Sequence, residues 1–218
     1  MQAVIQRAAA AAVLGVILFS CAAADAAVLT VPFGNEYTSG ITPAGAAPWL
    51  TATFDDHGTA GSVTLTLSAR LTGASEFVTR VLFNLDPALD PARLTFSAPT
   101  KIGTFADPVV ETGANAFSAG GGSRFDLQLT FDSSPPANRF GGTESVTYTL
   151  GGIATLTANS FAFTSTGGSV SLPASAHIQG VGIAGANSSW VTVPEPGSAA
   201  LLLLGASAAV AVVRRPRR

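Results

Sequence analysis

The segment SVTLTLSARL (residues 62–71) alternates apolar and polar side chains with a period of two. Successive side chains of a β-strand point to opposite faces, so this pattern predicts a strand with one buried face. The segment FDLQLTF (residues 125–131) has the same alternation. Further candidate strands are residues 28–31, 49–54, 77–85, 93–96, 145–150, 159–164 and 176–181.

Gly, Pro, Asn and Asp separate these segments, and no segment between the two ends has the pattern of an amphipathic helix. About nine short strands, each with one apolar face, predict an all-β fold: an antiparallel β-sandwich, jelly-roll-like in arrangement. Long loops are expected at residues 112–124 and 132–143. The predicted core consists of Phe54, Leu65, Leu67, Phe83, Phe96, Phe125, Leu127, Leu129, Phe131, Tyr148, Phe161 and Phe163.

The 218 residues are 47% hydrophobic and only 11% charged, whereas about a quarter of a soluble domain is usually charged. Long apolar runs occur only at the two ends, which disfavours a protein that crosses the membrane many times. The 13 phenylalanines disfavour intrinsic disorder, and the length suits one domain.

The N-terminal residues 1–26 have the pattern of a secretory signal peptide. Arg7 precedes an apolar stretch over residues 8–19, about 18 Å long as a helix and too short to anchor the chain in a hydrocarbon core of about 30 Å. Small residues at Ala24 and Ala26 place the expected cut after Ala26. In an alternative that stays open, LFSC (residues 18–21) is a lipoprotein signal that makes Cys21 the lipidated first residue.

Cys21 is the only cysteine of the chain. After a cut at Ala26 the mature protein therefore has no cysteine, which excludes disulfides, thiolate metal sites and cysteine-based catalysis.

The C-terminal end combines VPEPGS (residues 193–198), an apolar run over residues 199–213 and RRPRR (residues 214–218). The prolines hold the first element extended, and Ala and Leu favour a helix in the second, which is about 22 Å long. By the positive-inside rule the arginines keep the C-terminus in the cytoplasm and leave the preceding domain outside.

These three elements resemble the PEP-CTERM sorting signal of Gram-negative bacteria. The resemblance implies recognition by an exosortase, removal of the hydrophobic tail and delivery to the cell surface or the extracellular matrix, in a setting of exopolysaccharide production. An ordinary C-terminal tail anchor is the alternative. The resemblance assigns a motif at Pro194, Glu195 and Pro196, a transmembrane helix over about 197–213, and a basic stop at Arg214, Arg215, Arg217 and Arg218.

The region between the ends, residues 27–193, contains no recognisable catalytic constellation. Its two histidines are His57 and His177; Asp55–Asp56–His57 is typical of a turn after a strand, and His177 lies in a predicted strand where a structural role is expected. Neither a G-x-S-x-G nor an H-E-x-x-H motif occurs. We therefore expect no catalytic, cofactor-binding or metal-binding residues, and no enzyme activity.

The acidic residues Asp86, Asp90 and Asp107 are candidate calcium ligands. Their spacing does not match an EF-hand loop, and Asp-Pro is mainly a turn signature. The segment GGGS (residues 120–123) lacks the lysine of a phosphate-binding loop. Six basic and eleven acidic residues give residues 27–193 a net charge of −5, which argues against nucleic-acid binding.

The predicted function is therefore that of an exported, non-enzymatic surface or matrix protein, anchored transiently by its C-terminal helix, with a structural or adhesive ectodomain. Two alternatives stay open. A carbohydrate-binding module would use exposed aromatic residues such as Trp49, Trp190 and Tyr37, although packing in the core or beside the last strand is the expected role of the two tryptophans. A hydrolase acting on exopolysaccharide would need paired carboxylates, which only a structure can reveal.

Overall fold

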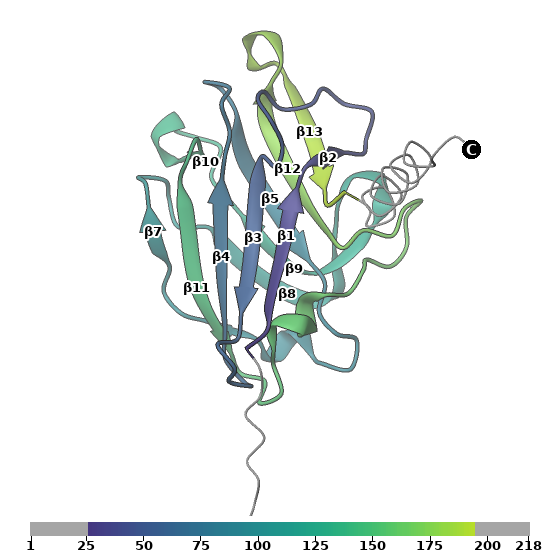
Figure 1. Cartoon of the computed structure of the whole chain (residues 1–218). Coiled ribbons are helices and arrows are strands. Elements are labelled where there is room, and N and C mark those ends of the chain that lie inside the picture. Colours follow the sequence, from purple (N-terminus) through teal and green to yellow (C-terminus); the bar gives the residue numbers. More distant parts are fainter. Residues whose placement is uncertain (1–25, 195–218) are drawn as a thin grey trace, which may run out of the picture.

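The computed structural model describes residues 26–194, and in this range the strands form two antiparallel sheets (Figure 1). The first sheet has the order β1–β3–β4–β11–β6, with β7 also paired to β11. Its strands are β1 (Val28–Phe33), β3 (Leu50–Asp55), β4 (Val63–Ala69), β6 (Thr95–Phe96), β7 (Thr100–Ile102) and β11 (Ser145–Gly151). The prediction of an all-β, antiparallel domain is confirmed.

The second sheet has the order β2–β13–β12–β5–β9–β8, with β10 also paired to β5. Its strands are β2 (Asn35–Glu36), β5 (Phe77–Phe83), β8 (Val109–Ser118), β9 (Arg124–Thr130), β10 (Phe140–Gly141), β12 (Ala174–Val181) and β13 (Asn187–Thr192). Short 3-10 helices in the connections are η1 (Pro91–Arg93), η2 (Gly120–Gly122), η3 (Pro136–Asn138), η4 (Ala158–Phe161) and η5 (Ile183–Gly185).

The main hydrophobic core lies between the two sheets, one of which stands in front of the other in Figure 1. Phe54 of β3 meets Phe83 of β5 edge-on, with ring centroids 5.1 Å apart, so the contact joins the sheets directly. Every predicted core residue is buried except Phe96 and Phe163, which are half-buried. A smaller cluster contains Leu82, Ala119, Phe125 and Leu172.

The hairpin of β3 and β4 confirms the alternation that predicted the fold. Val63, Leu65 and Leu67 of β4 are fully buried. The turn before β4 places His57, Gly58 and Gly61 at positive φ (47°, 72° and 89°), which explains why glycines punctuate it.

The outer side of the first sheet carries hydroxyl side chains. The strand registers align Thr30, Thr53, Thr66, Thr147 and Thr100 in one row across β1, β3, β4, β11 and β7. Thr66 and Thr147 share a hydrogen bond of 3.1 Å between their Oγ1 atoms. We call these five residues the threonine row.

Two predicted segments were wrong. Residues 159–164 do not form a strand; η4 occupies Ala158–Phe161, because Thr157 and Ser160 cap each other's backbone and fold the chain into a helical turn. Residues 112–124 are not a long loop, since β8 continues to Ser118 and pairs with β9, with a register shift between Thr112 and Phe117. The predicted loop over 132–143 is confirmed apart from the short elements η3 and β10.

The predicted signal peptide, apart from Ala26, and the predicted C-terminal helix lie outside the described residues. None of the helices within residues 26–194 has the length and apolar character that a membrane span needs.

Candidate functional site

The predicted sorting motif begins where the folded domain ends. Thr192, the last residue of β13, is buried: its hydroxyl donates to the carbonyl of Ala174 (2.6 Å), and its own carbonyl accepts from Gly34 (3.0 Å). Val193 is half-buried and packs against the core, whereas Pro194 is exposed. The chain therefore leaves the domain at the first residue of the motif.

The structure describes only Pro194 of the residues assigned by sequence to sorting. Glu195, Pro196, the apolar run over 199–213 and the arginines Arg214, Arg215, Arg217 and Arg218 lie outside the described residues. Their individual roles stay predictions.

Trp190 of β13 lies in a packed group on the second sheet rather than free at the surface. Its ring stacks on His177 of β12 at 4.6 Å between centroids, and the guanidinium of Arg80 lies 5.0 Å from the Trp190 ring. Thr79 Oγ1 is 2.8 Å from His177 Nδ1. Burial, together with the charge of Arg80, lowers the pKa of His177 to about 4, so this imidazole is neutral near pH 7.

The other two aromatic candidates are also packed. Trp49 is buried in the main core, and its Nε1 donates to the carbonyl of Gly45 (3.3 Å). The hydroxyl of Tyr37 lies 2.7 Å from Ser175 Oγ, and burial raises the pKa of Tyr37 to about 12. Packing explains all three rings without a ligand, as expected for the two tryptophans.

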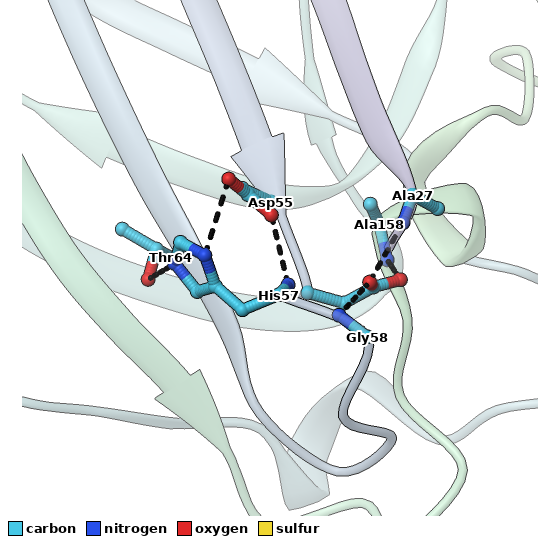
Figure 2. Close-up of polar contacts among 7 residues, drawn as sticks. Ala27, Asp55, His57, Gly58, Thr64 and Ala158 are labelled. Atoms are coloured by element: carbon cyan, nitrogen blue, oxygen red, sulfur yellow. Dashed lines mark hydrogen bonds and ion pairs between the residues drawn. The ribbon is translucent and has the colours of Figure 1, made fainter. Parts of the chain in front are cut away.

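The segment Asp55–Asp56–His57 forms the strand-end turn that the sequence predicted. Asp55 Oδ1 accepts from the backbone of His57 (2.8 Å), and Asp55 Oδ2 lies 3.3 Å from His57 Nδ1 (Figure 2). His57 Nε2 lies 3.1 Å from Thr64 Oγ1. These contacts account for the positions of the Asp55 and His57 side chains in the exposed half of the turn.

Asp56 was not singled out from its neighbours by the sequence, yet it is the most connected carboxylate of the turn. Only 4% of Asp56 is exposed. Its Oδ1 accepts from the backbone nitrogens of Ala27 (2.9 Å) and Gly58 (3.0 Å), and its Oδ2 accepts from Ala158 (3.2 Å). Figure 2 shows these three donors converging from separate segments. The bonds from Ala27 and Gly58 foremost hold the pKa of Asp56 below its usual range.

Two of the remaining acidic candidates are engaged in their own turns, and the third is engaged in an ion pair. Asp86 accepts from the backbone of Ala88 (2.8 Å), and Asp90 accepts from Ala92 (3.0 Å) at the start of η1. Asp107 pairs with Lys101. The turn interpretation of the Asp-Pro steps is thus confirmed, and within residues 26–194 no three His, Cys, Asp or Glu side chains are grouped as a metal site would require.

Comparison with known families identifies one match. Residues 192–218 match the family model described as the PEP-CTERM protein-sorting motif. The matched segment starts at the last residue of β13, so only its first residue, Thr192, belongs to the sheet, and the remainder follows β13. The chain has no match among curated proteins or solved structures.

Proposed function

We propose that this chain, whose residues 192–218 match the PEP-CTERM protein-sorting motif, is exported and delivered to the cell surface or extracellular matrix by an exosortase acting at Pro194–Pro196. The motif match carries the proposal. In this scheme a signal peptide starts export, the helix over about 197–213 holds the protein in the membrane, and the basic tail stays in the cytoplasm.

The end of the domain supports access by a membrane enzyme. The bonds of Thr192 fix β13 in its sheet, and Pro194 is already exposed. A protease that recognises Pro194–Glu195–Pro196 therefore does not have to unfold the last strand to reach the start of its motif. The folded ectodomain and the sorting signal act as separate parts.

Deletion of residues 194–218 in the native host tests this proposal. We expect the truncated protein to lose delivery to the surface, and the wild-type protein to lose the mass of its tail during maturation. Glu195→Ala in the full chain should mimic the deletion, whereas Glu111→Ala, which removes an exposed carboxylate of β8, should not. Surface delivery of the truncated protein together with an unprocessed wild-type mass would overturn the proposal.

For the ectodomain we propose a structural or adhesive role without catalysis. The threonine row supports it, because five aligned hydroxyl side chains on one sheet face can hydrogen-bond a polyhydroxylated polymer without charge. The related alternative, a carbohydrate-binding module, would use this face rather than Trp49, Trp190 and Tyr37, since those rings are packed.

Retention of the exported protein on polysaccharide extracted from the host tests this role. Replacing Thr53, Thr66 and Thr147 together by valine removes three hydroxyls of the threonine row and keeps β-branched side chains of similar shape. Thr130→Val on β9 of the second sheet is the matched control. We expect retention to fall for the triple variant and not for the control; unchanged retention of the triple variant would exclude the threonine row as the contact.

A further inference from the structure

The buried carboxylate of Asp56 has no cationic side chain as partner among the described residues, where the ion pairs are His57–Asp55 and Lys101–Asp107. The elements packed around it, β1, β4 and η4, contribute no charged residue. The titratable groups beside it are Asp55 and His57, which face each other. A carboxylate that is 4% exposed is expensive to keep charged without a partner, although three N–H donors lower that cost.

The nitrogen of Ala27 is the donor best placed to become that partner. It lies 2.9 Å from Asp56 Oδ1, and the carbonyl of Ala27 accepts from the backbone of Asp56 (3.2 Å). Ala27 is half-buried and packs against the main core, whereas Ala26 is exposed. Both backbone groups of Ala27 are therefore fixed by one residue, and the chain reaches solvent one residue earlier.

We propose that the signal peptide is cut between Ala26 and Ala27, and that Asp56 binds the new α-ammonium group of Ala27 as a buried ion pair. The inference rests on the export proposed above, because it requires a signal peptidase. Hydrolysis adds the hydroxyl of water to the carbonyl carbon of Ala26 and its hydrogen to the nitrogen of Ala27. The resulting amine takes one more proton from solvent.

The position of the cut decides whether this ion pair exists. A cut one residue earlier would put the positive charge on the exposed Ala26, and lipoprotein processing would start the chain at Cys21. In both cases the nitrogen of Ala27 stays a neutral amide. The ion pair with Asp56 therefore forms after only one of the cuts that the run of small residues permits, and the fold stabilises that processed chain more than its precursor.

The experiment uses the full protein recovered after export from its host. Intact mass and N-terminal sequencing locate the first residue, which we expect to be Ala27. Lys101 is the only lysine of the chain, so an amine-reactive acetylating reagent has two amines to label. Pairing should raise the pKa of the α-amine by about one unit or more above its usual value of about 7.7–8.0, and so slow its labelling at pH 7 about tenfold or more.

The reference for this slowing is Asp56→Asn, in which the α-amine should be labelled at the rate of an ordinary N-terminus. Wild-type protein unfolded in urea serves as the reference if Asp56→Asn does not fold. Asp55→Asn, which changes the neighbouring carboxylate, should be labelled as slowly as the folded wild type.

Four results are distinguishable. A chain that starts at Ala27 with a protected amine supports the inference. A chain that starts at Ala27 with an amine of ordinary reactivity overturns the ion pair, and a chain that starts at another residue overturns the cut; both leave export intact. A protein that is missing from the cell surface and still carries residues 1–26 overturns both the inference and the proposed export.

Discussion

Phe54→Ala tests whether the two sheets are held together as the structure shows. Phe54 is fully buried, and its ring contacts one aromatic from the opposite sheet and one from η4. The contact with Phe83 is edge-on at 5.1 Å, and the contact with Phe161 is stacked at 4.2 Å. Truncation to alanine removes these contacts and leaves a cavity between the sheets.

A buried Phe→Ala change usually lowers the free energy of unfolding by about 3–5 kcal/mol, and two aromatic pairs of about 0.5–1.5 kcal/mol each place Phe54 in the upper part of that range. We therefore expect a loss of about 4–5 kcal/mol, a large part of a total that is about 5–15 kcal/mol in most domains. The melting temperature should fall by about 8–20 °C, at about 2–4 °C per kcal/mol for a chain of this size.

Urea unfolding followed by tryptophan fluorescence measures this loss. The control is Val109→Ala on β8, whose side chain is 61% exposed and whose truncation should change the unfolding free energy by less than about 0.5 kcal/mol. A loss below about 1 kcal/mol for Phe54→Ala would refute the reasoning, because it would mean that the ring does not lie between the sheets.

Three further predictions concern single side chains. Tyr148→Phe should raise the free energy of unfolding by about 1 kcal/mol, because the buried Tyr148 hydroxyl has no hydrogen-bond partner among residues 26–194. Tyr37→Phe should lower it by about 0.5–1.5 kcal/mol, because the bond to Ser175 is lost. Changes of the same sign for both variants in urea unfolding would contradict this. The pKa of His177 is about 4 in the folded protein and about 6.5 when unfolded, so the unfolded chain binds the extra proton first and stability should fall as pH drops from about 6.5 to about 4. Melting curves of His177→Gln should show a weaker decline of stability over that range. A decline identical to that of the wild type would count against this prediction. Gly180→Ala should lower the free energy of unfolding by about 2 kcal/mol or more, because Gly180 has a φ of +77° and an added Cβ would lie 1.8 Å from the carbonyl oxygen of Ser75. Gly142→Ala, at a φ of +55° with nothing within 4 Å of the added Cβ, should lower it less in the same unfolding assay.

Local alternation was enough to predict the central strands. In β4 the apolar residues Val63, Leu65 and Leu67 all face the core, because a strand with one buried face requires a period of two. In residues 159–164 the pattern is too short to distinguish a strand from a 3-10 turn, and the hydrogen bonds of Thr157 with Ser160 decide the outcome.

The strands that the sequence did not reveal lack this alternation. β8 contains Gly113, Asn115 and two alanines, residue types that are depleted in strands, and it lies at the edge of the second sheet with little burial. β13 begins with the polar residues Asn187, Ser188 and Ser189. Pairing with a neighbouring strand, rather than local propensity, makes both of them strands.

The sorting motif and the surroundings of Asp56 also differ in whether local sequence is enough to predict them. The sorting motif could be predicted because its elements are adjacent in sequence, and the family match over residues 192–218 bears this out. The surroundings of Asp56 could not be predicted, since Ala27 and Ala158 are 29 and 102 residues away from it in the chain. Only the folded sheets bring those three segments together.

The most direct test of the central claim is the intact mass and cellular location of this protein in its host, with and without the exosortase gene. The proposed function predicts a surface protein that has lost its C-terminal tail in the wild type, and an unprocessed, membrane-bound precursor in the deletion strain. The same mass and the same surface location in both strains would contradict it.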